Sequence, residues 1–252
     1  MIGNVDISGL AAIVTGGGGG LGAAICSRLA ADGWTVVVND IDAAAADRVV
    51  ASIDGFGGAA VSGVADATDA GAVTDLVGDV ESRVAPVGVA VLNATGPQPN
   101  RAFADTQWPD VADELEFFVR SPLVMTHAVV PAMAARRWGR IVHIDSEVST
   151  KVPGHRTAYV TAKAAQVGLM RSAAVELAPD GITVNSVAPG FVPVTRHDDV
   201  SADDREAYRR TVPVGRLGEV DDVAAAVAFF ASPDAGFVTG QRLVVDGGRH
   251  LV

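Results

Sequence analysis

The stretch Thr15-Gly-Gly-Gly-Gly-Gly-Leu-Gly22 decides how the rest of this 252-residue chain is interpreted. An apolar run at residues 10–14 precedes it, and a segment with helical spacing of apolar residues, 23–30, follows it. Glycine permits a sharp turn at positive φ and a close approach by another group. The free amides and the positive dipole end of the following helix suit a phosphate. A flexible linker is the alternative, but its place between an apolar strand and an apolar-faced helix favours a phosphate-binding turn.

The composition indicates a well-buried globular protein, with 49% hydrophobic and 19% charged residues. A formal net charge of −11 argues against nucleic acid and anionic membranes as partners. The single cysteine, Cys26, excludes an internal disulfide, fits a reducing compartment and is interpreted as a small apolar filler. Residues 1–6 show no signal-peptide pattern, and no window holds about eighteen uninterrupted apolar residues. We therefore expect a cytoplasmic protein without a membrane span.

Apolar strand-like runs alternate with helical patterns along the whole chain, which predicts a parallel sheet with helices on both faces. The expected strands are 10–14, 35–38, 59–65, 87–92, 141–144, 182–187 and 242–245. The expected helices are 23–30, 43–53, 72–84, 110–137 and 158–177. No composition shift, long linker or repeat divides the chain. The prediction is an α/β fold, a Rossmann-type doubly wound parallel seven-stranded sheet in a single domain, 1–252.

Polar residues end successive strands of this sheet: Asp40, Asp66, Asn93 and Ser146. Ligands of such sheets bind beyond the carboxyl ends of the strands, so these side chains are expected at one rim. Asp40 follows the glycine turn at about the twenty-residue spacing that places a carboxylate on the ribose hydroxyls of an adenine nucleotide. A carboxylate there repels a 2′-phosphate, and no Lys or Arg occurs in 16–22 or 39–42. NAD is therefore favoured over NADP, with a solvated turn residue as the alternative reading of Asp40.

Tyr159-Val-Thr-Ala-Lys163 is interpreted as the reactive pair. Positions i and i+4 share a helix face, so the phenol and the ammonium are neighbours. A nearby cation lowers a phenol pKa by roughly one to three units from about 10, which makes the phenolate accessible. Such a group takes a proton from an alcohol while a hydride leaves the adjacent carbon, or gives one to a ketone in reverse. Ser146 is placed to hold the substrate oxygen.

These motifs together resemble the short-chain dehydrogenases/reductases of the compact type, over about Ile7 to Gly248. The resemblance rests on Thr15-Gly16-x-x-x-Gly20-x-Gly22, on Ser146, Tyr159 and Lys163, and on the segments 182–190, 212–218 and 239–248. The most similar members are 3-oxoacyl-carrier-protein reductases and NAD-dependent alcohol dehydrogenases. The resemblance implies a nicotinamide cofactor, a small alcohol or ketone substrate, a substrate flap at about 191–212, and a homotetramer assembled through 110–137 and 158–177.

By the same resemblance Ser146, Tyr159 and Lys163 are the catalytic residues, and Lys163 also binds the nicotinamide ribose. Asp66 is expected at the adenine amino group, and the Val192 backbone at the carboxamide. The full set of expected cofactor contacts is Gly16, Gly19, Gly20, Leu21, Asp40, Ile41, Asp66, Ala67, Asn93, Ala94, Tyr159, Lys163, Pro189 and Val192.

The chain departs from the family pattern at two places. Leu92-Asn93-Ala94-Thr95 stands where the family has two asparagines followed by Ala-Gly. The family's fourth catalytic residue, an asparagine that relays a proton to the lysine through water, is replaced by Phe118 or Leu115. Backbone carbonyls of that helix are an alternative route.

We therefore expect an NAD(H)-dependent oxidoreductase that interconverts a secondary alcohol and a ketone. An NADPH-dependent 3-oxoacyl-carrier reductase and a nucleotide-binding family member with little catalysis remain as alternatives. His143 is expected to be a satisfied core histidine, and no histidine pair has metal-ligand spacing, so no metal is expected. For Asp145 and Glu147 the sequence leaves two alternatives, a role at the substrate and structural hydrogen bonding.

Overall fold

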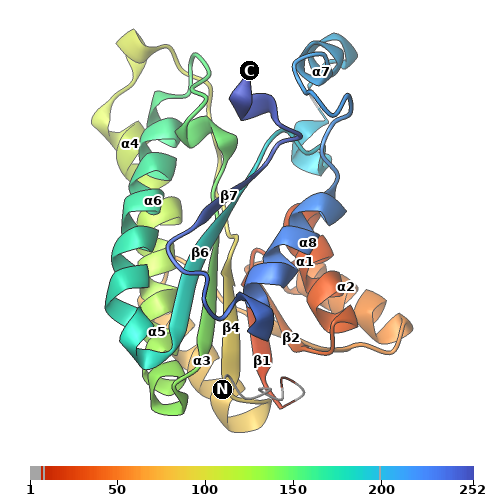
Figure 1. Ribbon diagram of the computed structural model, residues 1–252, viewed down its shortest axis with the longest axis vertical. Helices are drawn as coiled ribbons and strands as arrows, with labels where there is room; N and C mark the ends of the chain where they lie inside the picture. The colour runs from red at the N-terminus through yellow and green to blue at the C-terminus, as the bar shows by residue number, and fades with distance from the viewer. Residues whose placement is uncertain (1–6, 8, 199) are drawn as a thin grey trace.

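The computed structural model describes residue 7 and the ranges 9–198 and 200–252 (Figure 1). Residues 1–6, where no signal peptide is expected, lie outside the described residues, as does Asp199 of the expected flap.

The described residues form one parallel seven-stranded sheet in the order β3-β2-β1-β4-β5-β6-β7. Its strands are β1 (Ala11–Thr15), β2 (Thr35–Asp40), β3 (Ala59–Val64), β4 (Val87–Leu92), β5 (Gly139–Ile144), β6 (Ile182–Pro189) and β7 (Arg242–Val245). The strand order reverses between β1 and β4, which opens a crevice at their carboxyl ends. The doubly wound fold predicted from the sequence is confirmed.

Helices cover both faces of the sheet (Figure 1). They are α1 (Gly20–Ala31), α2 (Ala43–Gly55), α3 (Ala70–Arg83), α4 (Trp108–Leu115), α5 (Ser121–Arg136), α6 (Thr157–Leu177), α7 (Ala202–Arg209) and α8 (Val220–Ala231). On one face α1 packs against α8, and on the other α3 packs against α5 and α4 against α6. Figure 1 shows α7 and the C-terminus at the same end of the molecule.

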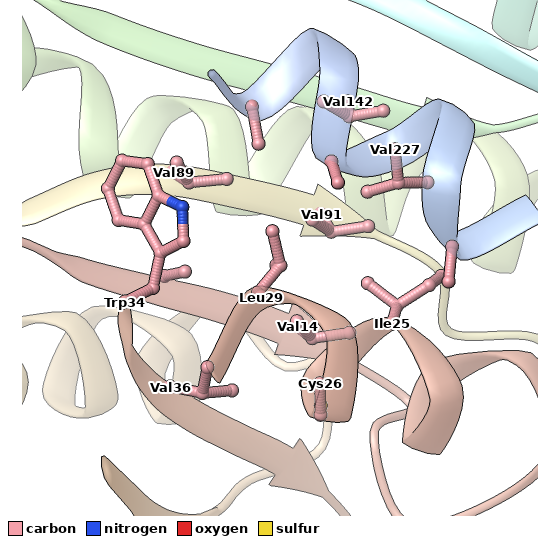
Figure 2. Packing of buried hydrophobic residues seen from close by; sticks show 14 of the residues in the cluster. Val14, Ile25, Cys26, Leu29, Trp34, Val36, Val89, Val91, Val142 and Val227 are labelled. Atoms are coloured by element: carbon pink, nitrogen blue, oxygen red, sulfur yellow. The ribbon is translucent and has the colours of Figure 1, made fainter. Parts of the chain in front are cut away.

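Two buried clusters hold the sheet between these layers. The first joins Val14 of β1 and Val91 of β4 to apolar side chains of α1 and α8, and Figure 2 shows Ile25, Leu29 and Val227 within it. The second cluster fills the opposite face with side chains of α3, α5 and α6. Cys26 is fully buried in the first cluster, and burial raises the pKa of its thiol, so its interpretation as an apolar filler is confirmed. Because both faces of β1 and β4 are covered, these strands are nearly continuous apolar runs without alternation.

The expected helix at 110–137 is wrong as a continuous α-helix. A π-helical turn, Glu116–Arg120, separates α4 from α5. Pro122 has no amide hydrogen and its ring conflicts with the carbonyl four residues earlier, so the wider turn accommodates it. Ser121 N accordingly bonds to the Glu116 carbonyl, five residues back. Pi turns of this kind occur frequently at functional sites.

Two helices, α7 and α8, were not predicted from the sequence. Both carry capping signals: Ser201 Oγ accepts from Asp204 N at the start of α7, and Glu219 N donates to Asp222 Oδ2 at 2.8 Å at the start of α8. The combined stretch Trp108–Arg136 is long and apolar enough for a membrane span by length and composition alone, a test that core helices also pass. Here its segments pack against α3, β4, β5 and α6.

Candidate active site

The glycine turn between β1 and α1 is packed so closely that side chains are excluded at its base. Gly16 has φ of +63°, a conformation that other residues rarely adopt. A Cβ at Gly22 would stand 2.0 Å from the Gly16 carbonyl oxygen. A Cβ at Gly19, in contrast, would meet nothing within 4 Å. Gly19 caps α1 and offers no side-chain acceptor to the first-turn amides.

Thr15 and Asn93 tie this turn to the end of β4. Thr15 Oγ1 accepts hydrogen bonds from Asn93 N and Ala94 N, both at 2.9 Å. The Asn93 side chain donates to the carbonyls of Thr15 at 2.9 Å and Gly16 at 3.0 Å. Thr15 belongs to the glycine motif of the sequence, but the motif alone predicted no role for its hydroxyl. The structure shows that this hydroxyl holds the two halves of the crevice together.

Asp40 ends β2 beside the same turn. Its Oδ2 accepts from Gly18 N at 2.9 Å, and its Oδ1 accepts from Asp42 N at 3.0 Å. These bonds orient the carboxylate against the glycine turn. Asp66 at the end of β3 accepts from Thr68 N and Oγ1, which holds its carboxylate at the same rim.

Tyr159 and Lys163 lie one turn apart on α6, buried to 7% and 3% exposure. Lys163 Nζ donates to the Ile144 carbonyl at 2.6 Å and to Gln166 Oε1 at 3.1 Å, and lies 5.9 Å from the centre of the Tyr159 ring. Ser146 follows β5, and its hydroxyl accepts weakly from Val148 N at 3.4 Å. The arrangement places phenol, ammonium and hydroxyl at the carboxyl end of the sheet.

Phe118, rather than Leu115, occupies the place beside the lysine. Lys163 Nζ lies 3.8 Å from the centre of the Phe118 ring, and that ring packs edge-on against Tyr159 with centroids 5.4 Å apart. The Arg156 guanidinium lies over the Tyr159 ring, 4.9 Å from its centroid. Tyr159 is thus enclosed by two cations and one aromatic ring, and a desolvated cation on an aromatic face contributes about 2 kcal/mol.

A cavity of about 960 Å³ joins these elements, which is at the upper end of the range for ligand pockets. Every site residue expected from the sequence lines it: Gly16, Gly19, Gly20, Leu21, Asp40, Ile41, Asp66, Ala67, Asn93, Ala94, Ser146, Tyr159, Lys163, Pro189 and Val192. Among the described residues that line it, the Lys and Arg side chains are Lys151, Arg156, Lys163 and Arg249. None of these comes from the segments that carry Asp40 and Asp66, so the two ends of the cavity differ in charge.

Several of the expected flap residues line the cavity, among them Phe191, Val192 and Tyr208 of α7. Tyr208 Oη donates to Glu147 Oε1 at 2.8 Å and accepts from Phe191 N at 2.7 Å. Burial is the first cause of a raised pKa of this phenol. Arg249 completes the cluster with an ion pair to Glu147 at 2.8 Å. Glu147 therefore holds the Tyr208 hydroxyl, and through it the Phe191 backbone, beside the end of β5.

Asp145 makes a different buried pair, with Arg242 of β7 at 2.5 Å. Arg242 also donates to the Ser146 carbonyl at 2.7 Å, so β7 supports the backbone of the expected catalytic serine.

His143 differs from the expectation of a core histidine with satisfied hydrogen bonds. It is buried in β5, 1% exposed, but neither ring nitrogen has a hydrogen-bond partner among the described residues. The histidine is a core residue, and the expectation that it is satisfied is wrong because its register neighbours, Leu92 and Ser186, offer it no bond. Burial lowers the pKa of His143 to about 3. Within the part of the chain that the structure describes, no group of three or more ligating side chains forms a metal site.

The cavity fits a dinucleotide. The space beside Gly19 and the N-terminal end of α1 suit a phosphate, and the carboxylate of Asp40 lies at the same glycine turn. Gly16, Asn93 and Lys163 line the same space farther along the crevice.

The comparisons with known proteins agree with this geometry. The family model described as Enoyl-(Acyl carrier protein) reductase matches residues 17–250. The 3-oxoacyl-[acyl-carrier-protein] reductase FabG of Escherichia coli is 35% identical over 251 residues, which are 98% of this chain and 100% of the relative. The chain belongs to the short-chain dehydrogenase/reductase family.

Two solved structures of short-chain dehydrogenases/reductases show how widely its members vary. A 3-oxoacyl (acyl-carrier-protein) reductase from Agrobacterium tumefaciens with NADP bound is 34% identical with a TM-score of 0.88, over 96% of this chain and 94% of that one. A 7α-hydroxysteroid dehydrogenase in complex with NADH and 7-oxo glycochenodeoxycholic acid is 33% identical with a TM-score of 0.92, over 97% and 96%. The family membership therefore implies a nicotinamide cofactor without selecting NAD or NADP.

Glu114, Gln166 and Arg156 are three residues around the Tyr159–Lys163 pair that sequence reasoning missed. Gln166 accepts from Lys163, Arg156 lies over the Tyr159 ring, and Glu114 is buried on α4, which packs against α6. Gln166 follows Lys163 by three residues, so helical spacing was a usable signal. Glu114 was recognisable only as a carboxylate four residues before Phe118.

Proposed function

We propose that this protein is an NAD(H)-dependent oxidoreductase that interconverts a secondary alcohol and a ketone. The observation that supports this most is the Tyr159–Lys163 pair, which opens into the same cavity as the glycine turn and Asp40. Acid/base chemistry and dinucleotide binding are thereby brought to one space.

The roles of the residues follow from their positions. The bound nicotinamide supplies the hydride acceptor. The Tyr159 phenolate takes the hydroxyl proton of the alcohol, and the neighbouring cations favour the phenolate over the phenol. The Lys163 ammonium contributes this positive charge and is held in place by the Ile144 carbonyl and Gln166. Ser146 orients the substrate oxygen.

The preference for NAD rests on charge at the far end of the cavity. Asp40 and Asp66 lie there, and the described residues that line this end include no Lys or Arg. A carboxylate fixed by Gly18 N accepts from ribose hydroxyls and repels a 2′-phosphate. The flap role of residues 191–212, a homotetramer and a cytoplasmic location are further parts of this proposal, and they are supported by the family resemblance.

The test is a cofactor-reduction screen with secondary alcohols of graded size and charge, followed at the absorbance of the reduced nicotinamide. Tyr159→Phe keeps the ring against Phe118 and removes the hydroxyl, so turnover should fall at least about a thousandfold while NAD affinity stays within about twofold. Retained turnover in Tyr159→Phe would remove this residue from the mechanism.

An NADPH-dependent 3-oxoacyl-carrier reductase is the second candidate, because the relatives from Escherichia coli and Agrobacterium tumefaciens carry that name. Thermal shifts with NAD and NADP side by side separate the two candidates. Stronger stabilisation by NADP, together with turnover of a 3-oxoacyl thioester, would favour the second.

A nucleotide-binding family member with little catalysis is the remaining alternative, because Phe118 replaces the expected asparagine. Cofactor binding without turnover of any alcohol or ketone in the screen would favour it.

A further inference from the structure

Glu114 is a buried carboxyl group at the back of the proposed catalytic pair. It lies on α4, only 3% exposed, and its Oε2 has no hydrogen-bond partner among the described residues. Burial of a carboxylate without hydrogen bonds is costly, so a group in this position needs a compensating charge or must hold a proton. A solvated surface glutamate has neither need.

The charges around Glu114 come mainly from α6, against which α4 packs. Burial raises the pKa of Glu114 to about 7, whereas the positive charges of Arg156 and Lys163 lower it and Asp113 raises it further. The other segment packed on α4, the π-helical turn, carries the exposed Glu116–Arg120 ion pair at 2.9 Å, and Arg120 also donates to the Thr68 carbonyl at 2.8 Å. Asp110, on α4 itself, is paired with Arg101 at 3.3 Å.

The Lys163 ammonium lies beside Phe118, where the family pattern has an asparagine. It donates to the Ile144 carbonyl at 2.6 Å and to the Gln166 amide oxygen at 3.1 Å, and it lies 3.8 Å from the centre of the Phe118 ring. Phe118 follows Glu114 by four residues, and both side chains are buried. The same stretch that removes the asparagine therefore adds a buried carboxyl.

We propose that Glu114 is a positioning residue of this active site: it is the buried counter-charge of Arg156 and Lys163, and its protonation state sets the pH range in which the Lys163–Tyr159 pair works. The proposal rests on the function proposed above.

The direction of the effect follows from Coulomb's law. An ionised Glu114 favours the ammonium form of Lys163 and disfavours the phenolate form of Tyr159, because the first charge is opposite and the second is alike. Both groups then hold their protons to higher pH than they do when Glu114 is neutral. Removal of this charge should therefore move both groups toward lower pH.

Glu114→Gln tests this, since it keeps the size of the side chain and removes its charge. The pH profile of kcat/KM in the oxidation direction should shift on both limbs to lower pH by about one unit. Asp113→Asn is the matched control: it removes the same charge from the adjacent, exposed residue, and its profile should stay within about 0.2 unit of the wild type. A profile of Glu114→Gln that coincides with the wild type would overturn the proposal, because a merely structural role changes the rate without moving the limbs.

A second measurement does not depend on turnover. A difference infrared titration of the cofactor-free protein should show a protonated carboxyl band that is lost near pH 7, present in Asp113→Asn and absent in Glu114→Gln. Persistence of the band in Glu114→Gln would refute the assignment. If the wild type turns over no substrate, the function proposed above fails, whereas the infrared result still decides the state of Glu114. Glu114→Met, of similar length, replaces the glutamine variant if the latter does not fold.

Discussion

Replacement of His143 by leucine should make the protein markedly more resistant to acid. His143 is fully enclosed by β4, β5 and β6, and neither of its ring nitrogens is hydrogen-bonded within the described residues. Burial first, and the positive charge of Lys163 second, lower the pKa of this imidazole to about 3. In the unfolded chain a histidine has a pKa near 6.5. Between about pH 6.5 and pH 3 the unfolded state therefore binds a proton that the folded state does not bind.

The size of the effect follows from linkage. Because the pKa is lowered on folding, the stability is fully present above pH 6.5 and is lost as the pH falls toward 3. At pH 5 the unfolded histidine is almost fully protonated, which costs the folded state about 2 kcal/mol relative to pH 8. At pH 3 the cumulative cost reaches about 4 kcal/mol. His143→Leu abolishes this component and also removes two unpaired nitrogens.

The assay is urea unfolding of wild type and His143→Leu at pH 8, 6 and 5, at one protein concentration. The difference between the two unfolding free energies should widen by about 2 kcal/mol from pH 8 to pH 5 in favour of the variant. His127→Leu, at an exposed histidine on α5, is the control and should follow the wild-type pH dependence. Parallel curves for wild type and His143→Leu would show that the buried imidazole is not the neutral, unbonded group described above.

Three other substitutions test the site. Asp40→Asn keeps an acceptor for Gly18 N but removes the charge, so the ratio of NADP to NAD affinity in calorimetric titrations should rise at least about tenfold; an unchanged ratio contradicts the charge argument. Gly22→Ala forces a methyl group against the glycine turn and should cost about 1–3 kcal/mol in urea unfolding and weaken NAD binding, whereas wild-type values would contradict the packing. Arg242→Leu leaves the buried carboxylate of Asp145 unpaired and should lower the unfolding free energy by about 3–5 kcal/mol, with partial recovery in the double variant with Asp145→Asn; a loss below about 1 kcal/mol would contradict the pairing.

Local patterns predicted the parts of this protein that depend on short-range chemistry. The alternation of apolar runs and helical spacing predicted the parallel sheet, since each strand must be covered on both faces. The glycine turn, the spacing to Asp40 and the i, i+4 relation of Tyr159 and Lys163 each express a backbone geometry or a helical period. Five residues of the turn line the cavity that the structure shows, together with Asp40, Tyr159 and Lys163.

The helical stretch after residue 108 shows where local patterns are insufficient. Continuous helical spacing predicted one helix, whereas Pro122 and the π-helical turn divide it. The extra residue of that turn sets which side chain faces α6, and a change of one residue rotates a helix face by about 100°. The position of Phe118 against Lys163 therefore depends on a backbone irregularity.

The sequence by itself determined the fold and predicted the glycine turn and the Tyr159–Lys163 pair, because glycine geometry and helical periodicity act over a few residues. Only the tertiary structure decided the surroundings of that pair. Glu114 is buried because α4 packs on α6, and Glu147 is held by Tyr208 and Arg249, which lie 61 and 102 positions away along the chain. Desolvation and ion pairing depend on which segments meet in space, so the charge state at the back of the site follows from the packing of the folded chain.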